Sequence, residues 1–233
     1  MAFLKTKVDT ETLKERGSSG AKYIYKSGIY PATLKIVSVD VSDNGSTSLN
    51  FNVEEENGNQ TTFYGLRLTN NDGSENFQAA TFHKLAIIAG LEEVSDPETE
   101  THKLGKDGKP TELEVLTDFT DLNVKIRVQE EYYKKERGTG DIAKRMVIKN
   151  FYRASDGAAA AEIVAEANGD SIEFGTQLSK DEVYASNVTY KDGLTAEDVD
   201  AWKETSKNNN KSSGSKAPAT KVNKPAGSLF GKK

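Results

Sequence analysis

Alternating apolar and polar positions mark strands in the first third of the chain. From Tyr30 to Ile36 every second residue is apolar, and the apolar phase then shifts by one residue to Val37. Such a shift predicts a β-bulge inside a strand that spans about residues 28–41. Two further alternating segments, 47–54 and 61–68, follow Asn-Gly turns. Together they predict a three-stranded meander.

The periodicity changes to helical spacing after this meander. Phe77, Thr81, Leu85 and Ile88 recur at intervals of three and four residues. Ser74 could cap the start of a helix, and a glycine at position 90 is placed to end it. Residues 94–112 are polar and predict an exposed loop.

Two more strands are expected at 124–133 and 144–152, joined by the turn "KERGTGD". The predicted order is therefore β-β-β-α-β-β. This order is typical of the OB-fold, a β-barrel whose exposed strands and loops commonly bind oligonucleotides. The sequence thus favours a mainly β, OB-fold-like barrel with accessory helices. A generic five-stranded α+β domain has the same order and is the alternative.

The remainder of the chain predicts accessory elements and a tail. A helix is expected in 154–170, strand and loop in 171–190, and a short helix capped by Thr195. From Lys207 onward the composition is low in complexity and predicts disorder. We divide the chain into an N-terminal extension (1–22), an OB-fold-like nucleic-acid-binding domain (23–155), a helical or irregular extension (156–206) and a disordered basic tail (207–233).

Charge is distributed unevenly along the chain. The net charge of all 233 residues is −5, but residues 204–233 contain seven lysines and one acid. That balance of +6 leaves −11 on residues 1–203. The chain has no cysteine, its N-terminus has no apolar signal-peptide region, and no apolar run approaches the roughly 20 residues of a membrane span. These features favour a cytoplasmic protein without a membrane partner.

The segment 124–153 concentrates nine Lys or Arg residues and four aromatic residues. Strand alternation places Val124, Ile126, Val128, Met146 and Ile148 on a core face. The opposite face combines cations, which can follow phosphates, with rings, which can stack on unpaired bases. The candidate nucleic-acid-binding residues on that face are Lys125, Arg127, Tyr133, Arg145, Lys149, Phe151 and Arg153.

This face also has a plain structural interpretation. Most runs of charge are solvated surfaces, and Glu130, Glu131 and Glu136 dilute the positive charge. Phe151 and Tyr152 point to opposite faces, so one of them must point inward. Tyr23, Tyr25, Tyr30 and Tyr64 are further stacking candidates, although half-buried strand residues are their default interpretation.

A resemblance sharpens the functional expectation. The stretches "GIYPATL", "SLNFNVEE", "TFHKLAIIAGL", "VKIRV" and "MVIKNFYR" resemble segments of small phage-encoded single-stranded DNA-binding proteins of the OB type. The resemblance covers residues 28–155. It implies a host-cytoplasmic protein that coats and protects single-stranded DNA during phage replication or recombination.

The end of the chain departs from this family pattern. Tails of such proteins often end in a hydrophobic or aromatic tip that docks on replication or recombination proteins, and here Leu229 and Phe230 match that tip. The family's tails are usually acidic before the tip, however, whereas this one is basic. The expectation that Leu229 and Phe230 dock on a partner protein therefore rests on the analogy with that family.

Signals for catalysis are weak. The two histidines, His83 and His102, lie in an apolar helix and a polar loop and show no metal-ligand spacing. No P-loop pattern is present. We predict no enzyme activity, no catalytic residues, no cofactor and no metal site. A nuclease with paired carboxylates and Mg²⁺ stays an alternative, as does a phage structural or assembly protein with a β-rich body and a flexible tail.

Overall fold

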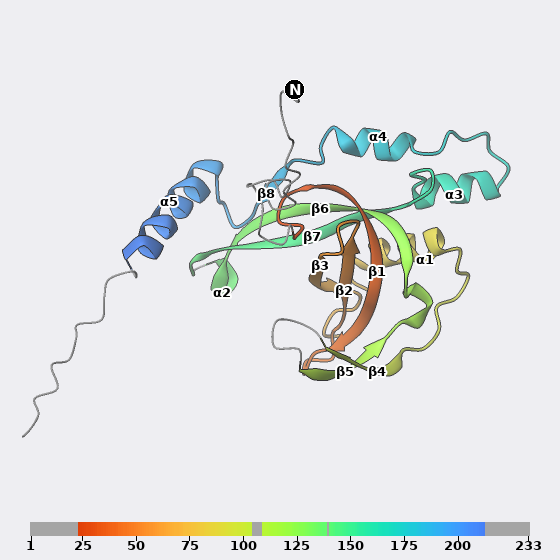
Figure 1. Ribbon diagram of the computed structural model, residues 1–233, viewed down its shortest axis with the longest axis horizontal. Helices are drawn as coiled ribbons and strands as arrows, with labels where there is room; N and C mark the ends of the chain where they lie inside the picture. The colour runs from red at the N-terminus through yellow and green to blue at the C-terminus, as the bar shows by residue number, and fades with distance from the viewer. Residues whose placement is uncertain (1–22, 104–108, 139, 213–233) are drawn as a thin grey trace, which may run out of the picture. The chain divides into compact units, whose positions relative to one another are not determined.

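The computed structural model describes residues 23–103, 109–138 and 140–212. It divides into two units between Asp192 and Gly193. The first unit is built on an eight-stranded sheet (Figure 1). Its strands are β1 (Gly28–Val41), β2 (Thr47–Glu55), β3 (Gln60–Arg67), β4 (Glu98–Lys103), β5 (Pro110–Val115), β6 (Leu122–Lys134), β7 (Ile142–Arg153) and β8 (Val188–Tyr190). Its helices are α1 (Ala79–Ala89), the 3₁₀ turn η1 (Thr117–Phe119), α2 (Lys135–Gly138), α3 (Ala160–Ala167) and α4 (Thr176–Glu182).

The long, curved strand β1 connects the parts of the sheet (Figure 1). One edge pairs antiparallel with β2, whereas the other pairs first with β6 and then with β5. The β1–β2 register shifts between Leu34 and Ile36, where Lys35 is the additional residue. This shift confirms the predicted bulge, and a bulge bends a strand. Because β1 bends, one of its edges can pair with two strands, first β6 and then β5.

The mainly β character and most predicted strands are confirmed. The meander β1–β2–β3 and the hairpin β6–β7 lie within one or two residues of the expected ranges. The predicted exposed loop at 94–112 is wrong, because β4 and β5 form an antiparallel hairpin there and β5 pairs with β1. These strands escaped detection because they are polar on both faces, as in "ETETHK", and an edge hairpin needs little apolar alternation.

Hydrogen bonding does not close the sheet into the predicted barrel. Among the described strands, β3 pairs only with β2 and β7 only with β6. In β3, Tyr64 and Gly65 together lie opposite Asn50, and Gly65 has a φ of 77°. The Asn50 side chain accepts a hydrogen bond from the Gly65 amide at 2.9 Å. This second bulge interrupts the even ladder of β3, which gives a physical reason for the open seam beside β7.

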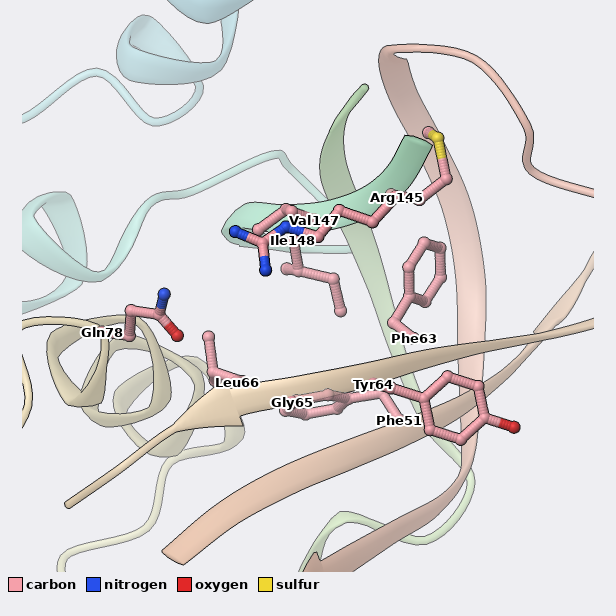
Figure 2. A pocket seen from close by; sticks show the side chains of 10 residues that line it. Phe51, Phe63, Tyr64, Gly65, Leu66, Gln78, Arg145, Val147 and Ile148 are labelled. Atoms are coloured by element: carbon pink, nitrogen blue, oxygen red, sulfur yellow. The ribbon is translucent and has the colours of Figure 1, made fainter. Parts of the chain in front are cut away.

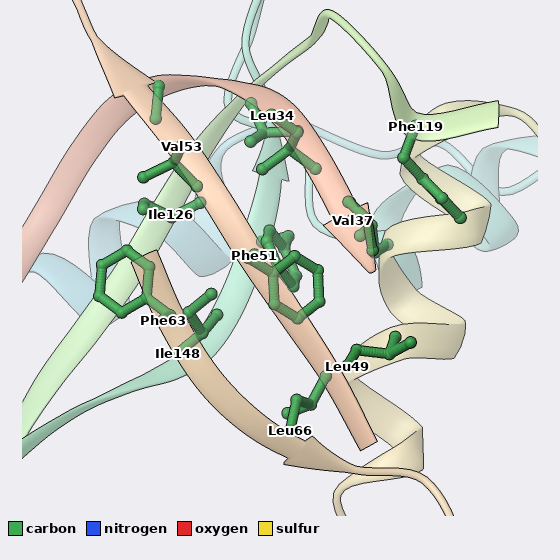
Figure 3. Close-up of a cluster of buried hydrophobic side chains, with 14 of the residues drawn as sticks. Leu34, Val37, Leu49, Phe51, Val53, Phe63, Leu66, Phe119, Ile126 and Ile148 are labelled. Atoms are coloured by element: carbon green, nitrogen blue, oxygen red, sulfur yellow. The ribbon is translucent and has the colours of Figure 1, made fainter. Parts of the chain in front are cut away.

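The hydrophobic core fills the concave side of the curved sheet and is covered by α1 (Figure 3). Phe82 of α1 packs on Phe119 with ring centroids 5.5 Å apart. Gly90 ends the helix in a left-handed conformation, as predicted. Ser74 does not cap it, because its hydroxyl donates to Asp72 within a local turn. The helix begins only at Ala79, and this turn chemistry explains the later start.

The segment after β7 packs on the same unit. Helix α3 contacts α1, and β8 adds to β6 as a parallel strand. The helix expected in 154–170 is confirmed as α3, whereas α4 replaces part of the strand or loop expected in 171–190. These elements belong to the unit that contains the sheet, although the sequence placed a domain boundary after residue 155.

The second unit contains α5 (Ala196–Ser212). Thr195 and Asp198 cap its start reciprocally, through backbone-to-side-chain bonds of 2.9 and 3.2 Å, as the sequence indicated for Thr195. The helix continues six residues past the point where disorder was expected, since extending an existing helix costs little. Leu229 and Phe230 lie outside the described residues. No helix in the described ranges is long and apolar enough to cross a membrane.

Candidate nucleic-acid interface

Three cations converge on one buried carboxylate at the outer face of β6 and β7. Glu131 of β6 is only 1% exposed. Its carboxylate accepts hydrogen bonds from Arg145 Nε and Nη2 at 3.0 and 2.9 Å and from Lys149 Nζ at 2.8 Å. Lys191, which follows β8, approaches the same carboxylate at 2.8 Å. We call Arg145, Lys149, Lys191 and Glu131 the cation cluster.

Each strand contributes to the cluster through its register. Glu131 lies directly opposite Arg145 in the β6–β7 ladder, so their side chains share a face. Lys149 lies four residues after Arg145 in β7, so strand alternation places its side chain on the same face, and it is the additional residue of a bulge there. The parallel pairing of β8 with β6 brings in Lys191, whose amide donates to the carbonyl of Tyr132.

Glu131 remains ionised over a wide range of pH. Burial alone would raise the pKa of its carboxyl, but the hydrogen bonds from Lys149, Lys191 and Arg145 outweigh that effect and lower the pKa to about 2. A buried carboxylate is tolerated because it is paired and hydrogen-bonded. Three positive charges around one negative charge leave a net charge of +2 on the cluster.

The cluster also presents unused hydrogen-bond donors to solvent. The side chains of Arg145, Lys149 and Lys191 are 48%, 33% and 41% exposed. The Arg145 guanidinium lies over the Tyr133 ring, 5.2 Å from its centroid, and this contact holds it in a fixed plane. An exposed guanidinium with several N–H groups can still bind an oxyanion while one edge is held by Glu131.

A pocket lies beside the cluster, at the open seam between β3 and β7. Figure 2 shows Phe63 and Leu66 of β3 and Ile148 of β7 facing the space between the two strands. Tyr64 and Arg145 also line this seam pocket, and Tyr64 is 77% exposed. The pocket therefore combines an apolar interior with an exposed ring and a cation.

The structure brings only part of the predicted nucleic-acid-binding set together. Arg145, Lys149 and Tyr133 meet at the cluster. The stacking role expected for Phe151 is wrong, because this ring is 0% exposed and packs 5.6 Å from the Phe51 ring. The reason is the β7 bulge at Lys149: it shifts the alternation, so Phe151 faces the core opposite Ile126.

The other three predicted cations lie elsewhere. Arg127 forms an ion pair with Asp181 of α4 at 2.7 Å. Arg153 forms an ion pair with Asp156 at 2.6 Å and lies over the Phe174 ring. Lys125 is half-buried and lines a separate hollow that also contains Glu54, Glu55 and Glu56. Arg127 and Arg153 therefore hold the segment after β7 in place rather than face a ligand freely.

Sequence reasoning missed two members of the cluster and undervalued Tyr64. Glu131 was considered a diluting charge, although its outward position opposite Arg145 follows from strand alternation. Lys191 gave no signal, because 60 residues separate it from Glu131 and the pairing of β8 with β6 is needed to join them. Tyr64 was expected to be half-buried, but it follows the buried Phe63 in β3, so strand alternation turns its ring to the outer face, where it is exposed.

Comparison with known protein families and with curated proteins finds no match to the chain. Within the described ranges no group of three or more His, Asp or Glu side chains is arranged to hold a metal ion.

Proposed function

We propose that this protein binds single-stranded DNA and coats it during phage replication or recombination in the host cytoplasm. The observation that supports this most directly is the position of Arg145, which belongs to the cation cluster and also lines the seam pocket beside Tyr64. A phosphate at the cluster would place the attached base within reach of an exposed ring. Docking of a replication or recombination protein on Leu229 and Phe230 is part of the same proposal.

Single strands fit this arrangement better than duplex DNA. Base faces are exposed only in single strands, and stacking on an aromatic ring is worth about 1–3 kcal/mol per base. In duplex DNA the base faces are covered, so Tyr64 would contribute little. A phosphate-only surface would bind both forms, which makes the ring the discriminating feature.

The topology adds support at the level of the fold. In the order β-β-β-α-β-β, with the β4–β5 hairpin as an insertion after α1, the strand β1 pairs with both β2 and β6. We include an OB-like relationship in the proposal, with the seam between β3 and β7 left open by the Tyr64–Gly65 bulge.

The test is a fluorescence-anisotropy titration of labelled oligo-dT and of a matched duplex. We expect tighter binding to oligo-dT and a loss of affinity with salt. The variant R145A should weaken binding about tenfold or more and flatten the log–log salt slope by about 0.7. Y64A should weaken binding by about 1–3 kcal/mol with an unchanged slope. K103A removes an exposed lysine of β4 and is the charge-matched control.

Each variant also needs a melting curve, since R145A leaves Glu131 with fewer partners. Equal affinity of the wild-type protein for duplex and single strand, or unchanged binding by R145A and Y64A, would contradict the proposed interface.

A structural or assembly role is the second candidate. It is favoured by two internal ion pairs, Arg127 with Asp181 and Arg153 with Asp156. Cations whose charge is balanced within the fold do not need an external anion. Absence of any oligo-dT binding by the wild-type protein at low salt would favour this candidate.

A further inference from the structure

Exposed aromatic side chains gather along one line of the sheet. The exposed large aromatic side chains in the described ranges are those of Tyr23, Tyr25, Tyr64, Phe77, Tyr184 and Tyr190. Tyr190 stacks on Tyr132 within the fold, with ring centroids 6.1 Å apart, and Tyr184 follows α4. The other four belong to β3 or to segments that bond to it. Single exposed rings are ordinary on a protein surface, but a line of them points to a ligand.

The segment before β1 provides the first position on this line. The amide of Ile24 donates to the Thr61 hydroxyl, at the start of β3, at 3.2 Å, and the Ile24 side chain is buried in the core. Tyr23 and Tyr25, on either side of it in the chain, are both exposed. The carbonyl of Tyr25 accepts a hydrogen bond from Lys144 Nζ of β7. The segment therefore contacts β3 and β7 at one end of the seam.

The other two positions lie farther along β3. Tyr64 comes three residues after Thr61 and lines the seam pocket. Arg67 comes three residues later, and its amide donates to the Gln78 side chain at 2.9 Å. Gln78 lines the seam pocket at the end away from Tyr64 (Figure 2), and Phe77 directly precedes it. Phe77 is 83% exposed, a large fraction for a phenylalanine. We call Tyr25, Tyr64 and Phe77 the aromatic row.

A cation accompanies each ring of the aromatic row. Lys26 lies over the Tyr25 ring, with Nζ 5.6 Å from its centroid. Arg145 shares the seam pocket with Tyr64. The third cation is the exposed Arg67, at the end of β3 that leads to Phe77. Alternation of rings and cations is what binds single strands, because rings stack on bases while cations follow the phosphates.

The spacing of the aromatic row suits several bases of one strand. Thr61, Tyr64 and Arg67 mark its three positions on β3, and at about 3.3 Å per residue they lie about 10 Å apart and span about 20 Å. One base step of a stacked strand covers only about 3.4 Å, so each ring must take a different base. The whole row corresponds to about six such steps.

We propose that a single DNA strand lies along the seam between β3 and β7, with separate bases stacked on Tyr25, Tyr64 and Phe77. This inference rests on the proposed function. It adds the path of the strand, two further stacking positions and the length of strand that the site engages. Tyr64 and the cation cluster form the centre of the path, so a very short strand reaches the centre but not both outer rings.

The first experiment measures the affinity of the full-length protein for dT12 by anisotropy and for dT4 by competition with labelled dT12. Y25A and F77A should each weaken dT12 binding at least about fivefold, the equivalent of stacking on one base. The salt slope should stay unchanged, because neither variant removes a charge. Binding of dT4 should change clearly less. Y184A removes a ring that is as exposed as that of Tyr25, both being 57%, and should leave dT12 binding unchanged.

Conservative variants separate stacking from a merely apolar contact. Y25F and F77Y keep an aromatic face and should bind dT12 like the wild-type protein. F77L keeps an apolar side chain without a ring face and should bind as weakly as F77A. Wild-type affinity in F77L would overturn the stacking role of Phe77.

Photochemical cross-linking tests the order of the rings along the strand. The probe is dT8 with a single 5-iodouracil near its 5′ end, at its middle or near its 3′ end, and mass spectrometry identifies the cross-linked residue. The middle position should cross-link to Tyr64, and the two ends should cross-link to Tyr25 and Phe77, one ring for each end. Cross-links from both ends to the same ring would overturn the proposed path.

The failures of the two proposals are distinguishable. Binding of dT12 that depends on Arg145 and Tyr64, but is unchanged in Y25A and F77A, would overturn the aromatic row and keep the proposed function. Absence of dT12 binding by the wild-type protein at low salt would overturn the function itself. A loss in Y184A as large as that in F77A would also overturn the row, because any exposed ring would then have the same effect.

Discussion

The two ends of the β6–β7 hairpin use similar residues for different purposes. At one end, residues 124–127 and 150–153, both faces are covered: Phe151 enters the main core and Tyr152 packs with Leu178 of α4. At the other end, around Glu131 and Arg145, one face carries cations that are a third to a half exposed. We call these the closed end and the open end.

The difference between the ends comes from what lies over them. At the closed end Arg127 pairs with Asp181, and the Tyr152 hydroxyl donates to the same carboxylate. Cations and rings there join α4 to the sheet. At the open end the acid is inside, at Glu131, so the cations point their remaining donors outward. The position of the acid therefore decides whether a basic, aromatic surface can act as a binding site.

The largest expected effect belongs to the closed end. F151A should lower the free energy of unfolding by about 3–5 kcal/mol, because it leaves a cavity beside Phe51 and Ile126. Chemical denaturation measures this loss. Wild-type stability combined with weakened oligo-dT binding would mean that Phe151 stacks on bases and that the two ends do not differ as described.

A smaller effect is expected at the buried acid of the open end. E131Q should lower the free energy of unfolding by up to about 3 kcal/mol at pH 7, since each pKa unit corresponds to about 1.4 kcal/mol. The pKa of Glu131 is depressed from 4.5 to about 2 in the folded protein, so its ionisation stabilises the fold above about pH 4.5. This stabilisation is lost as the pH falls through 2.

The difference between E131Q and the wild type should therefore shrink between pH 4.5 and pH 2. Denaturation curves at several pH values provide the measurement, with E112Q, at an exposed position of β5, as control. A constant difference from pH 7 down to pH 2 would show that Glu131 stabilises the fold by packing and not by charge.

The sequence predicted the two strands of the closed end correctly, but it did not predict which of their side chains are buried. Alternation identified β6 and β7, and the phase shift after Ile36 located the bulge in β1. No comparable shift in the sequence indicated the bulge at Lys149, because consecutive apolar residues before it (Val147 and Ile148) and consecutive aromatic residues after it (Phe151 and Tyr152) hide the change of phase. Phe151 was consequently assigned to the wrong face.

Partners far apart in sequence were the other limit of prediction. The pairs Arg127–Asp181 and Glu131–Lys191 join residues 54 and 60 positions apart, and nothing local in the sequence indicates either pairing. Local patterns therefore predicted which strands exist, whereas the assignment of each cation to an acid required the packing of α4 and β8.

The hydroxyl of Tyr152 offers a milder way to disturb the closed end. Burial raises the pKa of Tyr152, and so does its hydrogen bond to Asp181. Y152F keeps the ring under α4 but removes this bond to a charged acceptor, which should cost about 1.5 kcal/mol of unfolding free energy. Thermal melts measure the change. Unaltered stability would indicate that the remaining partners of Asp181, Arg127 among them, hold its carboxylate without the Tyr152 hydroxyl.

The smallest effect is expected for Lys125, the predicted cation that belongs neither to the cluster nor to an ion pair among the described residues, unlike Arg127 and Arg153. It lies opposite Tyr152 in the ladder and lines a hollow with three glutamates, whose negative charge disfavours a phosphate there. K125A should therefore change both stability and oligo-dT affinity by less than about 0.5 kcal/mol. The measurement is the anisotropy titration over a range of salt, alongside R145A. A salt slope flattened as much by K125A as by R145A would show that the DNA follows the whole hairpin, and the distinction between a closed and an open end would then fail.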